Sequence, residues 1–252
     1  MVRVILHGCN GRMGSVLTQM IAEEPDMEIV AGIDPAQNVA RDYPVYPVIF
    51  DCEEEADVII DFAAAAAVDA LLDYAVERQI PAVVCTTGLS EEQQAMIGEC
   101  AEKVAILRSA NMSLGVNLLM KLVQEAATTL YDAGFDVEIV EKHHNQKVDA
   151  PSGTAIALAD AVQAGVSEEM TYVYDRSQTR QKRDRKEIGF ASVRGGTITG
   201  EHDVIFAGTD EVVTFSHQAF SKAVFAKGAV SAAKYLAGKP AGLYQMKDVV
   251  GV

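Results

Sequence analysis

The sequence lacks several features that mark large classes of proteins. No apolar run reaches the ~18 residues that a membrane-spanning helix needs, and the start MVRVILHGCNG does not have the form of a signal peptide. Lysine and arginine are few: 21 of them stand against 36 Asp and Glu, so the net charge is -15 and the field repels polyphosphate. We therefore expect no signal peptide, no membrane span and no nucleic-acid partner.

Cysteine is scarce, and the cysteines present show neither a metal pattern nor a disulfide pattern. Cys9, Cys52, Cys85 and Cys100 have no CxxC spacing and no histidine at zinc-finger distances. Reduced thiols in a cytoplasmic protein are the simplest interpretation. The chain also lacks internal repeats, and its composition, 49% hydrophobic and 23% charged, is typical of a globular protein with a buried core.

Short apolar runs alternate with amphipathic stretches over the first part of the chain, which is typical of βαβ units in a parallel sheet. We predict strands at residues 2–7, 28–33, 57–62, 80–85 and 104–107. Helices are predicted at residues 13–24 and 68–77, and another after Ser90, where Ser-Glu-Glu-Gln has the form of a capping box. This part of the chain therefore predicts a Rossmann-like α/β domain.

The pattern changes after residue 112. A helix is predicted over residues 114–132, followed by strands at 136–142, 188–194, 197–202, 203–207 and 211–216, several of them joined by glycine-containing turns. These strands predict a mixed, largely antiparallel sheet. A last helix at 221–236 carries an alanine-rich apolar face and is expected to pack on the first domain. We predict one domain over residues 1–112, completed by 221–252, and a second α+β domain over 113–220.

The glycines after the first strand stand in the context of a dinucleotide fingerprint. Gly8 suits the tight turn, Gly11 lets backbone N–H groups approach a pyrophosphate, and Gly14 allows helix and strand to pack closely. The spacing GxxGxxG departs from GxGxxG, and a purely structural turn is the competing interpretation. Asp34 supports the cofactor, because it ends the second strand about 20 residues further on, where a carboxylate accepts hydrogen bonds from ribose hydroxyls.

The residues after Asp34 bear on the choice of cofactor. Pro35 and Ala36 follow it, with no adjacent Arg or Lys. Because a carboxylate repels the 2′-phosphate of NADPH and no neighbouring cation neutralises it, we expect NADH to be preferred. Use of NADPH is the alternative, because Arg12 and Arg41 are cations that could bind its 2′-phosphate.

The densest set of reactive side chains lies in residues 141–155, EKHHNQKVDAPSGTA. His143 can exchange a proton near neutral pH, and Lys147 offers a fixed positive charge or a proton. Ser152-Gly153-Thr154 then opens a helix whose N–H groups suit a small carboxylate. The competing interpretation is a polar loop with an ordinary helix cap.

A metal site is the alternative use of these histidines, and we do not expect one. Zinc would need more ligands than His143 and His144. His202 and His217 could supply them after folding, yet the sequence contains no HxxxH or Cys/His cluster.

Together these motifs resemble one family, dihydrodipicolinate reductase, also called 4-hydroxy-tetrahydrodipicolinate reductase, of the diaminopimelate route to lysine. GCNGRMG at residues 8–14 is similar to its amino-terminal signature, and residues 143–155 are similar to its central one. Further similar segments are residues 86–88, 109–113, 187–196, 200–202 and 225–229, so the resemblance spans nearly the whole chain.

The resemblance implies an oxidoreductase that passes hydride from a nicotinamide dinucleotide to a cyclic dicarboxylate, with loss of water, to give tetrahydrodipicolinate. His143 would be the catalytic proton donor or acceptor and Lys147 a second proton donor, while His144, Gly153 and Thr154 would hold the substrate carboxylates. The dinucleotide would be bound by Gly8, Cys9, Asn10, Gly11, Arg12, Met13, Asp34, Cys85, Thr86, Thr87, Ser109, Ala110, Asn111 and Met112. The second domain would bind substrate and assemble a homotetramer through its sheet.

Two positions depart from the family pattern. Cys85 stands where members often have Gly, which concerns loop geometry, and Pro35 stands where NADP-using members can have Arg, which favours NADH. Two other functions stay open: a related amino-acid dehydrogenase on the same scaffold, and a non-catalytic dinucleotide sensor. The basic run at residues 176–186 is interpreted as a solvated loop, with anion gathering and subunit contact as alternatives.

Overall fold

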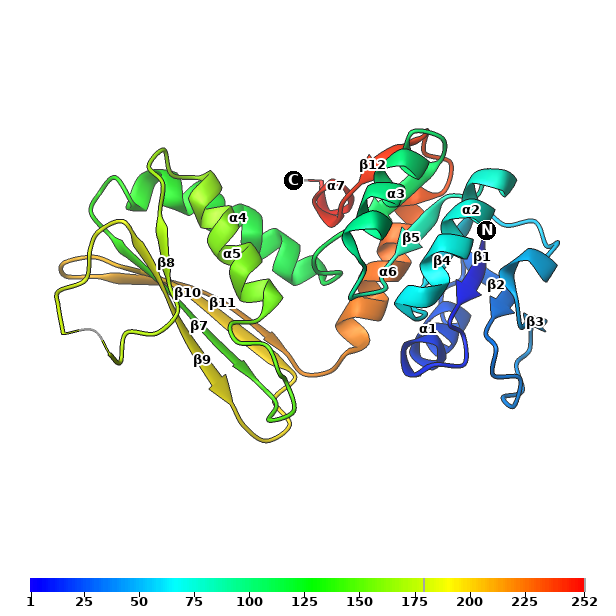
Figure 1. Ribbon diagram of the computed structural model, residues 1–252, viewed down its shortest axis with the longest axis horizontal. Helices are drawn as coiled ribbons and strands as arrows, with labels where there is room; N and C mark the ends of the chain where they lie inside the picture. Colours follow the sequence, from blue (N-terminus) through cyan, green and yellow to red (C-terminus); the bar gives the residue numbers. More distant parts are fainter. Residues whose placement is uncertain (179, 252) are drawn as a thin grey trace. The chain divides into compact units, whose positions relative to one another are not determined.

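The computed structural model describes residues 1–178 and 180–251 (Figure 1). Thr179, in the predicted second domain and basic run, and Val252, at the end of the segment predicted to complete the first domain, lie outside the described residues. Contacts within the chain divide it into two compact units. Unit 1 comprises Met1–Ser113 and Ala223–Gly251, and unit 2 comprises Leu114–Lys222.

Unit 1 is built on a parallel sheet of seven strands in the order β12-β6-β5-β4-β1-β2-β3. The strands are β1 (Val2–His7), β2 (Met27–Ile33), β3 (Val45–Tyr46), β4 (Val58–Asp61), β5 (Ala82–Val84), β6 (Ala105–Arg108) and β12 (Gly242–Tyr244). Because every pairing is parallel, the carboxyl ends of the strands share one edge of the sheet. Ligands of open parallel sheets bind at such an edge.

Helices cover the sheet of unit 1. They are α1 (Arg12–Ala22), α2 (Val68–Arg78), α3 (Glu91–Ala101), α6 (Ala223–Leu236) and α7 (Met246–Val250), with short 3-10 turns η1 (Ile49–Asp51) and η2 (Ala65–Ala67). α2 packs on α3, and α6 packs on α1, β4, β5 and β6. The predicted capping box is confirmed, because the side chains of Ser90 and Gln93 each accept the other residue's backbone N–H.

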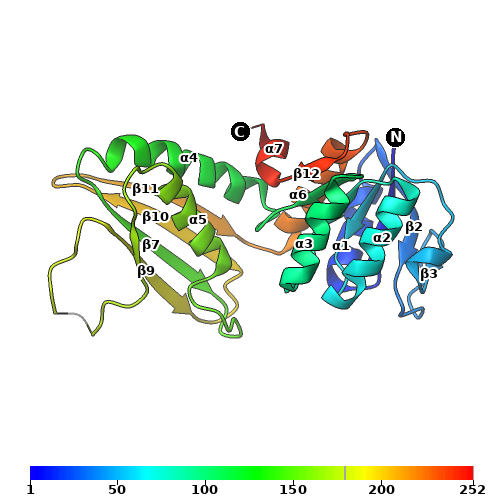
Figure 2. The ribbon, with the colours of Figure 1, turned by 45° about the horizontal axis from the view of Figure 1, so that its top comes forward.

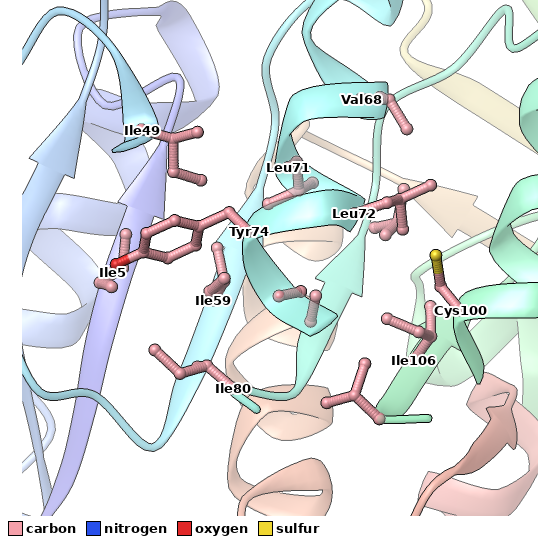
Figure 3. Packing of buried hydrophobic residues seen from close by; sticks show 14 of the residues in the cluster. Ile5, Ile49, Ile59, Val68, Leu71, Leu72, Tyr74, Ile80, Cys100 and Ile106 are labelled. Carbon is pink, nitrogen blue, oxygen red and sulfur yellow. The ribbon is translucent and has the colours of Figure 1, made fainter. Parts of the chain in front are cut away.

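A cluster of buried apolar side chains fills the space between the sheet and α2 and α3 (Figure 3). Ile5 and Ile59 from the strands meet Leu71 and Tyr74 from α2, and none of these four is more than 1% exposed. The Tyr74 hydroxyl donates to the Cys52 carbonyl at 2.9 Å, so the buried polar group has a partner. Each large side chain buried in this way stabilises the fold by about 1.5–3 kcal/mol. The cluster fixes the strands whose carboxyl ends carry the loops of the site.

Unit 2 packs two helices on a five-stranded sheet with the order β11-β10-β7-β9-β8 (Figure 2). Its elements are α4 (Leu114–Leu130), β7 (Asp136–His143), α5 (Gly153–Ala164), β8 (Thr171–Val173), β9 (Glu187–Arg194), β10 (Gly200–Ala207) and β11 (Val212–Ala219). β10 pairs antiparallel with β7 and β11, whereas β9 pairs in parallel with β7 and β8. The predicted fold class, a Rossmann-like parallel sheet with a second, mixed sheet, is confirmed.

One predicted break in this sheet is wrong, because residues 197–202 and 203–207 are not two strands. β10 runs without interruption from Gly200 to Ala207. His202 and Val204 lie on its buried side, while Asp203 lies on the opposite face, 4.0 Å from the ammonium of Lys142. Polar residues are common on the outward face of an antiparallel strand, so Asp203 continues the strand although its polarity suggests a turn in the sequence.

No helix in the described part of the chain combines the length and the apolar character needed to cross a lipid bilayer.

Candidate active site

Two glycines shape the loop between β1 and α1. Gly8 has a φ of +80°, and a Cβ there would lie 2.7 Å from the Phe62 carbonyl oxygen. At Gly14, in the first turn of α1, a Cβ would lie 2.3 Å from the carbonyl oxygen of Gly8. Helix and loop therefore pack backbone to backbone, as predicted for Gly14. The loop sits at the carboxyl edge of the sheet with a helix N-terminus behind it, a geometry that fits a pyrophosphate.

Asp34 follows β2 and lies against this loop. Its carboxylate accepts the backbone N–H of Asn10 at 3.0 Å and that of Ala36 at 2.9 Å. Arg41 reaches the same loop, where its guanidinium donates to the side-chain oxygen of Asn10 at 3.0 Å and to the carbonyl of Cys9 at 2.6 Å. The predicted loop residues and Asp34 therefore lie together, and Arg41 braces them.

The other two predicted dinucleotide segments follow β5 and β6, at the same edge of the sheet. The buried Thr86 donates its hydroxyl to the Ala63 carbonyl at 3.1 Å. Burial, with Asp61 nearby, raises the pKa of the Cys85 thiol well above its ordinary value, so this cysteine stays neutral. Cys9 is fully buried, so it offers a ligand its backbone alone. All of the predicted dinucleotide residues belong to unit 1.

In unit 2, β7 ends at His143. Val137, Ile139, Glu141 and His143 alternate on its buried side, so the imidazole continues the row of core side chains. Its Nδ1 lies 2.5 Å from a carboxylate oxygen of Glu141. Burial lowers the pKa of His143, and the Glu141 carboxylate acts in the opposite direction. The side chain is 10% exposed, so it is held at the border between the core and the solvent.

Arg194, at the end of β9, binds the same carboxylate from the neighbouring strand. Its two terminal nitrogens donate to the two carboxylate oxygens of Glu141 at 2.8 Å and 2.6 Å, a bidentate pair. Burial would raise the pKa of Glu141, but hydrogen bonds from Arg194, Ser192 and His143 lower it to about 2. Glu141 is therefore a fully buried carboxylate that remains ionised.

α5 begins where the central motif predicts a helix start. Ser152 is its N-cap, and the Ser152 hydroxyl accepts the N–H of Ala155 at 3.2 Å. The backbone N–H of Ser152 donates to Glu141 at 3.2 Å. Gly153 and Thr154 form the first turn of the helix, at its positive end. The helix N-terminus and the His143 ring thus share one carboxylate.

His202, on β10, completes the cluster. Its Nε2 lies 3.0 Å from the Ser152 hydroxyl, and its ring meets the His143 ring edge to face, with centroids 5.1 Å apart. Burial, with a smaller effect of His143, lowers the pKa of His202 to about 4. His217 lies opposite His202 on β11. Across residues 1–178 and 180–251, no three His, Cys, Asp or Glu side chains are grouped so that they could hold a metal ion.

Lys147 and His144 lie in the segment between β7 and α5. The ammonium of Lys147 pairs with Asp149 at 2.8 Å, and its backbone N–H donates to the His144 carbonyl at 3.2 Å. A partly exposed ion pair of this kind is worth little, so Lys147 can exchange Asp149 for an anionic ligand at small cost. The predicted catalytic and substrate residues, His143, His144, Lys147, Gly153 and Thr154, all belong to unit 2.

Two family models match consecutive parts of the chain. "Dihydrodipicolinate reductase, N-terminus" matches residues 2–112, and "Dihydrodipicolinate reductase, C-terminus" matches residues 115–250. The chain belongs to the dihydrodipicolinate reductase family. A 4-hydroxy-tetrahydrodipicolinate reductase from Caldanaerobacter subterraneus subsp. tengcongensis is 52% identical over 250 residues, which cover 99% of this chain and 98% of the relative. One from Clostridium tetani is 45% identical over 246 residues, 98% and 96% of the two chains.

Solved structures agree with this assignment. A dipicolinate-bound dihydrodipicolinate reductase from Paenisporosarcina sp. TG-14 has a TM-score of 0.80 and 25% identity, and the match covers 97% of both chains. The C. glutamicum DAP dehydrogenase in complex with DAP has a TM-score of 0.58 at 14% identity over 99% of this chain and 95% of that chain, a likeness of fold alone. The predicted family and its reductase activity in diaminopimelate and lysine biosynthesis are confirmed.

Three side chains of the candidate site carry no predicted catalytic role: Glu141, Arg194 and His202. The sequence pattern could have pointed to Glu141, because a carboxylate at an inward-facing position of a strand needs a buried partner. Arg194 lies 53 residues further along the chain, and only the register of β9 against β7 brings the two together. From the sequence, His202 is a potential zinc ligand and part of the family-similar segment 200–202, without a catalytic role.

The basic run differs from the predicted solvated loop at three of its members, one of which, Arg176, pairs with Glu187 on β9. The side chain of Arg183 is 15% exposed and pairs with Asp136 and Glu138 on β7. Arg185 lies over the ring of Tyr131, 4.8 Å from its centroid. These arginines attach the segment before β9 to the rest of unit 2.

Proposed function

We propose that this member of the reductase family converts 4-hydroxy-tetrahydrodipicolinate to tetrahydrodipicolinate with NADH as the hydride donor. The observation that carries the proposal is the His143 ring, hydrogen-bonded through Nδ1 to Glu141, which also accepts the N–H of the α5 N-cap Ser152. A dicarboxylate substrate that gains a proton needs an anion-binding helix end beside a proton-transfer group. The related protein from Paenisporosarcina sp. TG-14 is described with dipicolinate bound.

The dinucleotide supplies the hydride when it is bound. The loop from Gly8 to Met13 would hold its pyrophosphate through backbone N–H groups, because Gly14 lets the helix N-terminus lie directly behind the loop. Asp34 would accept hydrogen bonds from the ribose hydroxyls. The segments after β5 and β6, Cys85 to Thr87 and Ser109 to Met112, would line the same edge of the sheet.

His143 would move the proton. An ionised carboxylate accepts hydrogen bonds and donates none, so Glu141 keeps the proton of the neutral ring on Nδ1 and leaves Nε2 to exchange a proton with the substrate. The lowered pKa of His143 makes the protonated ring a ready donor. Lys147 would act as a second proton donor and stabilise negative charge as it develops.

The first turn of α5 would bind the carboxylates. Backbone N–H groups at Gly153 and Thr154 stand at the positive end of the helix dipole, and His144 and Lys147 add polar and positive side chains nearby in the sequence. Such a local concentration of positive charge is needed because the whole chain carries a net charge of -15, which repels a dianion.

The cofactor preference is argued from Asp34 and Arg41. Asp34 places a carboxylate at the end of β2, where the 2′-phosphate of NADPH would be repelled. Arg41 could neutralise that phosphate, but its guanidinium already donates to Asn10 and Cys9. We expect a higher kcat/KM with NADH than with NADPH. A clear preference for NADPH would overturn this choice and leave the reductase assignment in place.

We also infer a homotetramer assembled through the sheet of unit 2. α4 and α5 pack on one face of this sheet, whereas Val193 and Val212 on the opposite face are 46% and 61% exposed. Light scattering should give about four times the chain mass of 27.0 kDa, and a monomer would reject the inference. We place the protein in the cytoplasm, where its buried cysteine thiols stay reduced.

The proposed function is tested by following NADH absorbance with enzymatically generated 4-hydroxy-tetrahydrodipicolinate. Oxidation of NADH with this substrate supports the proposal. Activity with an amino acid alone would indicate a related dehydrogenase on the same scaffold, and NADH binding without turnover of either substrate would indicate a sensor.

A further inference from the structure

Glu141 connects two parts of the candidate site that lie apart in the sequence. One of its carboxylate oxygens is 2.5 Å from Nδ1 of His143, and the other accepts the backbone N–H of Ser152, the N-cap of α5, at 3.2 Å. The proton-transfer group and the anion-binding helix end are therefore held by the same side chain. A shift of this carboxylate would move both.

Arg194 fixes that carboxylate from β9. His143 and Arg194 are register partners across the parallel β7–β9 pair, which brings the guanidinium next to Glu141. Arg194 donates to both oxygens of Glu141 and also to the carbonyl of Asp149. The carboxylate thus has little freedom to rotate, and its charge is neutralised without a proton.

A role in stability alone does not account for this arrangement. Glu141 is fully buried and follows Val137 and Ile139 in the inward-facing row of side chains on β7. A buried ion pair is commonly no more stabilising than apolar residues of similar volume, because both charges lose their hydration. An apolar side chain at position 141 would fill the core, but it could not orient an imidazole.

β10 packs closely against the His143 ring. A Cβ at Gly200 would lie 3.1 Å from Nε2 of His143, so glycine at this position lets the ring pass close to β10. His202 packs against the ring edge to face. With Nδ1 bound to Glu141, Nε2 is the nitrogen left to meet a substrate.

We propose that Glu141, clamped by Arg194, is the positioning residue of the reaction, which sets the tautomer and orientation of His143 and ties the ring to the N-terminus of α5. The inference rests on the proposed function for its effect on turnover, but the tautomer itself can be measured without substrate. Glu141 does not touch the substrate in this account and acts through His143.

The first test is the tautomer of His143 in the wild-type protein, read from nitrogen-15 NMR of the imidazole at a pH where the ring is neutral. The expected pattern is a protonated Nδ1 and an unprotonated Nε2. A protonated Nε2 would overturn the proposal, whether or not the protein turns over the substrate.

The second test compares Glu141→Gln with Glu138→Gln. Glu138 is on the same strand, faces the other side of the sheet and is also paired with an arginine, Arg183. Glu141→Gln should lower kcat roughly 10- to 100-fold, by analogy with the loss of a carboxylate that orients a metal-bound histidine, whereas Glu138→Gln should retain the wild-type kcat. NADH binding and far-UV circular dichroism check that each variant is folded.

The pH profile separates positioning from a structural role. The charged or titratable groups around His143 are Glu141, Arg194 on β9, Lys147 and His202 on β10, and among them Glu141 alone carries a negative charge. Its removal should lower the pKa of His143, so the fall of kcat at high pH should move to lower pH in Glu141→Gln. Arg194→Lys, which retains the charge but not the bidentate geometry, should show a smaller loss of kcat.

The outcomes are distinct. An inactive wild-type protein with His143 protonated on Nδ1 rejects the proposed function and retains the positioning of the ring. An active wild-type protein whose kcat and pH profile survive Glu141→Gln rejects the positioning role. If Glu141→Gln does not fold, the wild-type tautomer and Arg194→Lys decide.

Discussion

The carboxylate of Asp34 accepts the backbone N–H of Asn10 at 3.0 Å, so the end of β2 is joined to the glycine loop after β1. The same carboxylate accepts the N–H of Ala36. Asp34 therefore braces the loop that would hold the pyrophosphate, and in the proposed function it would also present an acceptor to the ribose.

Replacement of Asp34 by Asn should impair the use of NADH more than the use of NADPH. The neutral amide removes the repulsion of the 2′-phosphate and a charged acceptor for the ribose, a hydrogen bond worth about 1.5–3 kcal/mol. We expect kcat/KM for NADH to fall about 10- to 100-fold and the ratio of NADH to NADPH to fall with it. Asp42→Asn, which removes the same charge from the exposed residue next to Arg41 in the sequence, is the control and should change neither value. An unchanged ratio in Asp34→Asn would contradict the role of Asp34.

Gly14→Ala should destabilise the protein and weaken NADH binding, because the new Cβ would lie 2.3 Å from the Gly8 carbonyl oxygen. Overpacking of this kind costs about 1–3 kcal/mol. Gly98→Ala, also inside a helix, meets nothing within 4 Å and should stabilise the protein by about 0.5–1 kcal/mol. Urea denaturation measures the free energy of unfolding of both variants, and a titration with NADH measures binding. Equal effects in the two variants would show that the backbone contact of Gly14 has no consequence.

Stability should decrease in mild acid because of His202. Burial lowers its pKa from 6.5 to about 4, so the unfolded chain takes up the proton first. The contribution of His202 is complete above pH 6.5 and is lost as the pH falls toward 4, by about 3 kcal/mol in total. His202→Gln keeps an amide near the Ser152 hydroxyl but does not titrate. The free energy of unfolding, measured by denaturation at several pH values between 6.5 and 4, should depend less on pH in the variant than in the wild type. The same dependence on pH in both proteins would rule out His202 as the source.

The sequence predicted the parts of the molecule that have a local signal. β1 with its glycine loop, the capping box at Ser90 and the central motif around His143 depend on residues close together in the chain, and each lies where predicted. β3, β8 and β12 were not predicted, since they have two or three residues each and are too short to show a period.

The side-chain pairs within the site depend instead on how distant strands pair in the sheet. Arg194 meets Glu141 through the parallel pairing of β9 with β7, and His202 meets Ser152 across 50 residues. No local pattern around Arg194 distinguishes it physically from a surface arginine at a strand end, and the family resemblance of residues 187–196 assigns it no role. Such pairs become visible only when the strand order of the sheet is known.

The proposed division of roles gives the proton chemistry to unit 2 and the binding of the dinucleotide to unit 1. Its most direct test is the single-turnover rate of NADH oxidation in His143→Ala and Lys147→Ala, measured together with the Kd for NADH. Lys142→Ala, on the outward face of β7 beside Glu201, serves as the control. The rate should be lower by about 10²–10⁴-fold for the loss of a proton-transfer group, with an unchanged Kd. Near-normal turnover in both His143→Ala and Lys147→Ala would contradict the proposed division of roles.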